Sequence, residues 1–301
     1  MNTPAERALT GPLVVGVDGS EPSLRAVDWA ADEAALRAVP LRVVYACLWE
    51  RYEGAALARD IGKPTALPLA QDVVGAAARR ARDRHPGLRV SADVVFEEPE
   101  YALVREARHA SALVVGTRGR SGIAETLLGS VSLAVAAHAD CPVIVLRGSH
   151  DNQATPPVHG RVVVGVGEDA KEPAAVRFAA EEARRRGVPL EAVRAWRRPA
   201  HETTDHPLLV GDPARLREEG AAEELEAALQ DVPEDVEVHR RTVEGHARRV
   251  LVDASHRADL LVVGATRREG HFGLQLGRVA HAVLYHSACP VAVVPHQAHE
   301  N

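Results

Sequence analysis

Two glycine-containing segments of the sequence have the composition of a phosphate-binding loop. Gly116-Thr117-Arg118-Gly119 directly follows the apolar run 112–115, and Gly129-Ser130 follows after nine further residues. Glycines allow the backbone to turn tightly and approach a ligand, and the start of a helix presents N–H groups that lack intrahelical partners. These residue types in this order predict that backbone groups bind a phosphate.

Ser130 is the predicted N-cap of the helix that follows the second glycine segment. It precedes Val131 and a largely apolar stretch, and the first turn contains no Asp or Glu. Because an anion stabilises the positive end of a helix dipole, a bound anion is expected to take the place of an acidic side chain.

The elements that position this loop read as alternating strands and helices. Apolar strands are predicted at 41–47, 90–96, 112–115 and 143–146, with helices at 72–84 and 101–109. This alternation predicts a parallel sheet, in which ligands bind at the carboxyl ends of the strands. Asp18, Ala46 and Gly116 all fall at such ends. The connection from Glu50 to Pro68 is long, which is typical of a lid or binding loop.

The spacing G-x2-G-x9-G-S resembles the ATP-binding signature of the universal stress protein family. Asp18, in the segment Val14 to Ser20, is similar to the acidic residue that this family carries at the end of its first strand. The resemblance implies an α/β fold of the Rossmann-like, adenine nucleotide alpha hydrolase-like type, with a five-stranded parallel sheet between helices. It also implies ATP as the ligand, with or without Mg²⁺.

The resemblance further implies roles for individual residues. Asp18 would approach the ribose or a phosphate-bound cation, and Ala46 would contact adenine through its backbone. The remaining residues of the implied site are Val115, Gly116, Gly119, Gly129, Ser130 and Val131. Simpler interpretations stay open, because Asp18 and Gly19 could form only a turn and Ser20 could only cap the next helix.

The sequence repeats itself after about 148 residues, which indicates a duplicated domain. Arg161 to Gly167 restates the first strand, and Leu260 to Gly264 restates 112–116. The predicted organisation is a first domain at 1–147, a linker at 148–160 and a second domain at 161–301. We expect the last strands, around 143–146 and 291–294, to join the two domains edge to edge.

The second domain lacks key residues of the phosphate loop. Gly167 stands in place of the aspartate, Arg267 in place of the second loop glycine, and Gly277-Arg278 in place of glycine-serine. An arginine at a helix start opposes the dipole, so the second site is predicted to be lost. In the alternative interpretation, Arg267 and Arg278 bind an anion through their side chains.

Composition narrows the class of protein. The net charge of −6 and the absence of a basic stripe disfavour nucleic-acid binding. The N-terminus has no signal-peptide pattern and no apolar run approaches about 18 residues, so a soluble, cytoplasmic protein without membrane contact is expected. Cys47, Cys141 and Cys289 form no C-x-x-C pair and are expected to be packing residues.

The leading hypothesis is an ATP-binding regulatory or sensor protein of the stress response. The alternatives are an interaction or dimerisation module with a vestigial pocket, and a slow ATPase. No metal-binding motif and no catalytic residue are identified, and a homodimer is left open.

Overall fold

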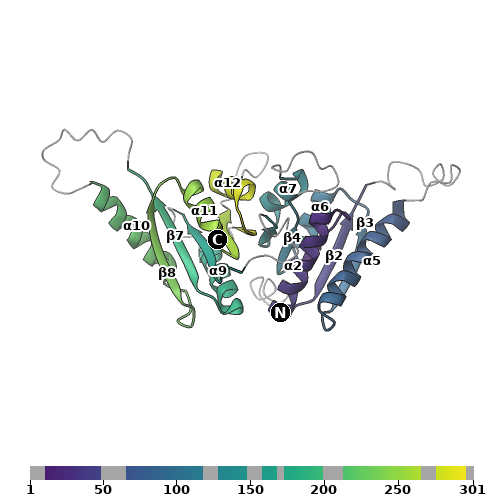
Figure 1. The fold of residues 1–301 in the computed structure, drawn as a ribbon. Helices are drawn as coiled ribbons and strands as arrows, with labels where there is room; N and C mark the ends of the chain where they lie inside the picture. The colour runs from purple at the N-terminus through teal and green to yellow at the C-terminus, as the bar shows by residue number, and fades with distance from the viewer. Residues whose placement is uncertain are drawn as a thin grey trace, which may run out of the picture. The chain divides into compact units, whose positions relative to one another are not determined.

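The computed structural model describes residues 11–48, 66–117, 128–147, 158–167, 173–198, 213–265 and 276–295. The chain divides into two compact units, with described residues up to 147 in the first and from 158 in the second. Each unit alternates strands and helices around its own parallel sheet (Figure 1). The predicted fold class, two tandem Rossmann-like α/β domains, is therefore confirmed.

The first unit contains five strands in the order β3-β2-β1-β4-β5. The strands are β1 (Leu13–Gly16), β2 (Leu41–Ala46), β3 (Val90–Val95), β4 (Ala112–Val115) and β5 (Val143–Val145), and every neighbouring pair within the unit is parallel. The order reverses at β1, because the chain runs outward to β3 and then returns to the other side as β4. Ligand sites of doubly wound sheets form at such a switch point.

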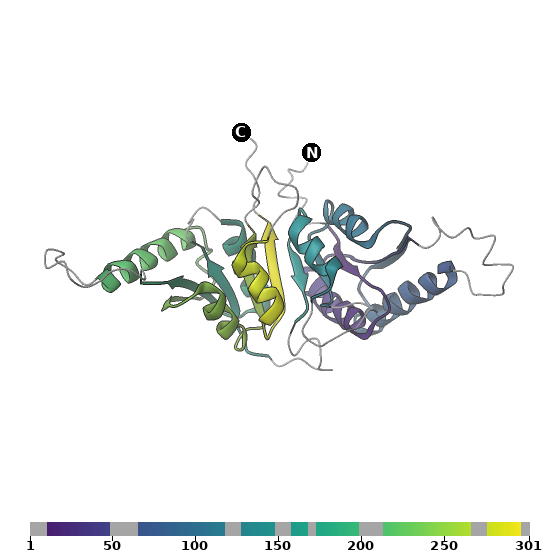
Figure 2. The same ribbon diagram turned by 90° about the horizontal axis from the view of Figure 1, so that it is seen from above.

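The helices of the first unit cover both faces of its sheet. They are α2 (Glu21–Arg37), α5 (Ala66–Arg84), α6 (Pro99–Ala107) and α7 (Ser130–His138). Helix α2 packs beside α5, and α6 packs beside α7 (Figure 2). Burial on both faces explains why strand β4 is apolar and buried at each of its positions.

Helix α5 begins earlier than predicted. The expected loop extended to Pro68, but the helix starts at Ala66 and contains Pro68 in its first turn. A proline is tolerated there because the first N–H groups of a helix have no intrahelical acceptor. The rest of the predicted loop, up to residue 65, lies outside the described residues.

The second unit repeats this arrangement with strand order β10-β9-β6-β7-β8. Its strands are β6 (Val162–Val166), β7 (Leu190–Trp196), β8 (Val238–Glu244), β9 (Leu260–Ala265) and β10 (Val291–Pro295). Its helices are α9 (Pro173–Arg186), α10 (Pro213–Leu229), α11 (Ala247–Ser255) and α12 (Arg278–His286). The same elements therefore lead to the carboxyl edge of the sheet in both units.

Candidate functional site

The turn after β1 is fixed by a small hydrogen-bond network. Asp18 Oδ1 accepts hydrogen bonds from the Ser20 N–H at 3.0 Å and the Ser20 hydroxyl at 2.6 Å. Ser20 is the N-cap of α2, and its side chain accepts from the Ser23 N–H. Gly19 between them has φ +80°, a conformation that favours glycine. Asp18 and Ser20 therefore do form the turn and cap of the simpler interpretation, at the carboxyl end of β1.

The chain segments around the phosphate-loop glycines meet at the end of β4. The Gly129 N–H donates to the Thr117 carbonyl at 2.6 Å, and the buried Ser132 hydroxyl donates to the Gly116 carbonyl at 2.7 Å. A Cβ at Gly116 would lie 3.0 Å from the Pro22 carbonyl oxygen, which explains the glycine at this position. The start of α7 is thereby tied to the end of β4, which itself lies close to the start of α2.

The N-cap prediction for Ser130 is wrong by one position. Gly129 is the N-cap, with φ −64° and ψ 149°, and Ser130 is the first helical residue. The cap makes no side-chain hydrogen bond, and the first turn contains no acidic residue. The orphan N–H groups at this helix start therefore have neither a side-chain acceptor at the cap nor an acidic residue in the first turn, as the sequence led us to expect for an anion site.

These segments enclose a cavity of about 360 Å³ at the switch point between β1 and β4. It is lined by the predicted residues Asp18, Ala46, Val115, Gly116, Gly129, Ser130 and Val131. The remaining predicted residue, Gly119, lies outside the described residues, as do Arg118 and Arg120. The structure thus brings the described part of the predicted site together in one place.

The cavity is also lined by residues that the sequence motif did not predict. They are Gly16, Val17, Ser23, Val44, Pro99, Leu103 and Ser132. Ser23 and Ser132 are small polar residues in the first turns of α2 and α7, a signal that could have identified them. Pro99 and Leu103 come from α6, which only the folded sheet places near the loop. Among the lining residues that the structure describes, Asp18 is the one that is ionisable.

The equivalent edge of the second unit has different chemistry. Gly167 follows β6 and is exposed, where the first unit has Asp18. Helix α12 has Gly277 as its N-cap, with φ −56° and ψ 154°, and the exposed Arg278 as its first residue. Ala280 takes the place of Ser132 and has no hydroxyl to donate. Arg267 lies outside the described residues. Of the two arginines in the alternative interpretation, the structure therefore describes Arg278.

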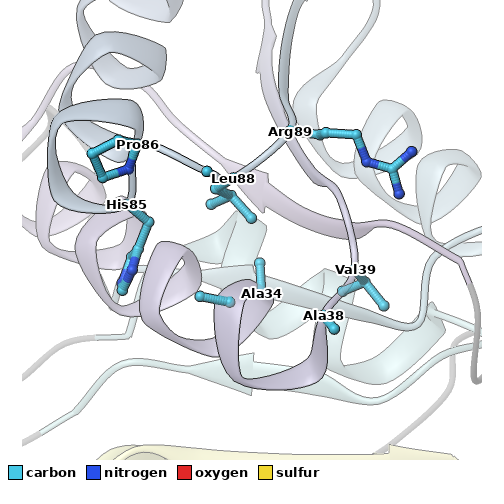
Figure 3. Close-up of a pocket in the computed structure, with 9 residues that line it drawn as sticks. Ala34, Ala38, Val39, His85, Pro86, Leu88 and Arg89 are labelled. Carbon is cyan, nitrogen blue, oxygen red and sulfur yellow. The ribbon is translucent and has the colours of Figure 1, made fainter.

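A second hollow, of about 440 Å³, lies at the opposite edge of the first sheet (Figure 3). Ala38, Val39 and Leu88 form an apolar centre, with His85 and Arg89 at its two ends. The hollow is larger, but the C-terminus of α2 lines it, and the negative end of a helix dipole disfavours an anion. Of these two hollows, the smaller one near Asp18 has the helix start and glycines of a phosphate site.

The cysteines are not placed for catalysis or metal binding. Burial, with a smaller effect of Asp140, raises the pKa of Cys141 to about 12, and burial likewise raises the pKa of Cys289 to about 12. Cys47 is half-buried. Among the residues that the structure describes, no cluster of His, Cys, Asp or Glu could hold a metal ion. No described helix is long and apolar enough to cross a membrane.

The fold defines two doubly wound α/β domains, the first with a cavity at its switch point beside a helix start whose N-cap, Gly129, makes no side-chain hydrogen bond. A model of the universal stress protein family matches residues 10–147 and again 159–295. Universal stress protein Rv2005c of Mycobacterium tuberculosis is 35% identical over 298 residues, with 93% of this chain and 96% of the relative covered. The chain therefore belongs to the universal stress protein family, with two tandem family domains.

Two further comparisons agree with this assignment. A universal stress protein of Mycolicibacterium smegmatis is 30% identical over 289 residues, which cover 94% of this chain and 96% of the relative. The crystal structure of a universal stress protein from Archaeoglobus fulgidus has a TM-score of 0.67 at 18% identity, covering 95% of this chain and 98% of that one. At that identity the solved structure supports the fold alone.

Proposed function

We propose that the chain is an ATP-binding regulatory protein whose first domain holds the nucleotide in the cavity between β1 and β4. The observation that carries this proposal is the convergence of the predicted site residues on one cavity. Asp18, Gly116 and Gly129 are far apart in the sequence, yet all three line it. Its volume of about 360 Å³ lies within the usual range of small-molecule sites.

The lining offers a distinct partner for each part of ATP. The N–H groups at the start of α7 bind phosphate oxygens, because the cap residue offers them no side-chain acceptor and they lie at the positive end of the helix. Asp18 binds a ribose hydroxyl or a phosphate-bound Mg²⁺ with its carboxylate. Ala46, at the end of β2, contacts adenine through its backbone. Gly119 completes the loop in this proposal, as the family resemblance implies.

The proposal includes no catalytic step. The only ionisable side chain among the described residues of the lining is Asp18, and its Oδ1 already accepts two hydrogen bonds from Ser20. Activation of water by a general base requires a deprotonated group within hydrogen-bond reach of that water. We therefore assign the first domain to nucleotide binding that sets a conformation, and the second domain to a structural or interaction role.

A pair of matched valine substitutions tests the site. Gly129 and Gly277 are equivalent N-caps with extended backbone angles that valine also adopts, so neither substitution strains the backbone. The two substitutions differ in the surroundings of the added side chain. Gly129→Val places a branched side chain at the cavity wall and is expected to weaken ATP binding at least about 100-fold, an estimate that corresponds to about 2.7 kcal/mol. Gly277→Val is expected to leave ATP affinity unchanged.

Binding should be measured by calorimetry with ATP, ADP, AMP and cAMP, each with and without Mg²⁺, and folding checked by circular dichroism. A folded Gly129→Val protein that binds ATP like the parent would show that the nucleotide lies elsewhere. Absence of binding by the parent would favour the interaction module with a vestigial pocket. Phosphate release at saturating ATP would favour the slow ATPase.

A further inference from the structure

The first turns of α6 and α11 are equivalent in the two units but carry opposite charge. Each helix follows the outermost strand of its sheet, β3 or β8, at the carboxyl edge. Glu98, Glu100 and Tyr101 in the first unit correspond to His246, Arg248 and Arg249 in the second. We call the group Phe96, Glu98, Glu100 and Tyr101 the acidic-aromatic turn, and the group His246, Arg248 and Arg249 the basic turn.

The arginines of the basic turn do not stabilise their own helix. Arg248 and Arg249 lie in the first turn of α11, where the helix dipole disfavours cations. Both are exposed, and neither forms an ion pair with any residue that the structure describes. The positive charges of Arg248 and Arg249 also act on His246. The largest cause that lowers the pKa of His246 is Arg197, and Arg248 and Arg249 lower it further. This placement is unfavourable within the domain and suits contact with an acidic surface.

The acidic-aromatic turn has the complementary composition. Tyr101 is 68% exposed and Phe96 is 40% exposed, although aromatic residues make up only 3% of the chain. Glu98 is exposed and Glu100 is half-buried, and in the described parts of the chain neither carboxylate is ion-paired. Guanidinium groups bind both carboxylates and the faces of aromatic rings, so this surface fits arginine side chains.

We propose that the acidic-aromatic turn of one copy of the chain binds the basic turn of a second copy. Each chain carries one copy of each surface, which is what a twofold dimer that forms the contact twice requires. Pairing of two acidic-aromatic turns, or of two basic turns, would bring equal charges together. The first domain of one copy is therefore expected to pair with the second domain of the other. Tyr101 and the two arginines belong to the residue types that dominate interface affinity. The proposal does not depend on nucleotide binding.

Sedimentation of the full-length protein at increasing concentration tests the proposal. We expect a dimer that weakens as salt is raised, because exposed charges are screened beyond a Debye length of about 8–10 Å. Glu100→Arg and Arg248→Glu are each expected to weaken dimerisation at least about tenfold, because each places equal charges opposite one another. The two substitutions combined in one chain restore the pairing and should return the dissociation constant to within about threefold of the parent.

Two further variants separate this contact from general effects of charge. Tyr101→Ser is expected to weaken the dimer without changing net charge. Arg257→Glu, beyond the other end of α11, should leave it unchanged. A monomer at every concentration, a dimer indifferent to the single reversals, or a double variant no better than either single variant would overturn the proposal. A monomer whose stability changes in Glu100→Arg or Arg248→Glu would also overturn the proposal, because the acidic-aromatic turn and the basic turn would then contact each other within one chain.

Discussion

The buried hydroxyl of Ser132 donates a 2.7 Å hydrogen bond to the carbonyl of Gly116 and so ties the first turn of α7 to the end of β4. Gly116 and Ser132 both line the cavity of the first domain. The second domain has Ala280 at the position of Ser132, and no such bond is available there. The two domains therefore differ in this hydrogen bond between helix and strand, as well as in charge.

Ser132→Ala is predicted to lower the free energy of unfolding of the first domain by about 0.5–1.5 kcal/mol, because it leaves a buried carbonyl without its donor. Denaturant unfolding measures the loss. The matched control is Ser130→Ala, which removes an exposed hydroxyl that makes no cap hydrogen bond and should change stability by less than about 0.5 kcal/mol. Equal stability of the Ser132 variant and the parent would contradict the role of this bond.

Gly116→Ala is predicted to destabilise the first domain by about 1–3 kcal/mol, the usual range for an overpacked site. The added Cβ would lie 3.0 Å from the Pro22 carbonyl oxygen, and a backbone atom has little room to move. Gly87→Ala is the control, since nothing lies within 4 Å of its added Cβ. Thermal or urea unfolding compares the stabilities of the two variants. A Gly116 variant as stable as the Gly87 variant would show that the backbone of α2 moves away from the added Cβ at little cost.

The pH dependence of stability is predicted to change in Glu191→Gln. Burial alone would raise the pKa of Glu191, but hydrogen bonds from Arg241 and Arg161 lower it below its ordinary value of 4.5. A lowered pKa in the folded state means that the ionised group contributes stability above pH 4.5 and loses it as the pH falls through the folded pKa. The variant should be less stable than the parent by about 1–3 kcal/mol at neutral pH.

This deficit of Glu191→Gln should shrink in unfolding experiments below pH 4.5, the ordinary value for this group. Glu219→Gln is the control, because its pair with Arg215 is exposed and such pairs contribute little. A deficit that stays constant across this range would mean that the ion pairs of Glu191 do not stabilise the fold.

Thiol labelling should distinguish the three cysteines. With pKa values of about 12, Cys141 and Cys289 carry almost no thiolate near pH 8, and both side chains are buried. Iodoacetamide is therefore expected to modify the half-buried Cys47 first in the native protein, and all three cysteines in denaturant. Rapid native labelling of Cys141, mapped by mass spectrometry, would contradict its placement in the core.

Local patterns in the sequence predicted the fold and half of the residues that line the cavity in the described part of the chain. Apolar runs such as Ala112–Val115 identify buried parallel strands, and the residues that follow such strands must meet at one edge. Asp18 and Gly116 were found in this way. The repeat of about 148 residues indicated the second domain, because two strongly similar strand patterns occur in the same order.

Other features depend on contacts between distant segments and were not predicted. Leu103 reaches the cavity only because α6 packs over β1, where a Cβ on Gly16 would lie 2.9 Å from it. The start of α7 was misplaced by one residue, since Gly129 and Ser130 are both acceptable caps and backbone geometry decides between them. The φ of −64° at Gly129 does not itself require a glycine. Its small size near the cavity is the remaining physical reason.

Calorimetric titration of the full-length protein with ATP in the presence of Mg²⁺ tests the central claim most directly. The first domain has the cavity, the uncapped helix start and Asp18, whereas the second has Gly167 and Arg278 at the equivalent positions. The predicted result is about one ATP per chain, with binding lost in Gly129→Val and retained in Gly277→Val. Two equivalent sites per chain, or no binding by the parent with or without Mg²⁺, would contradict it.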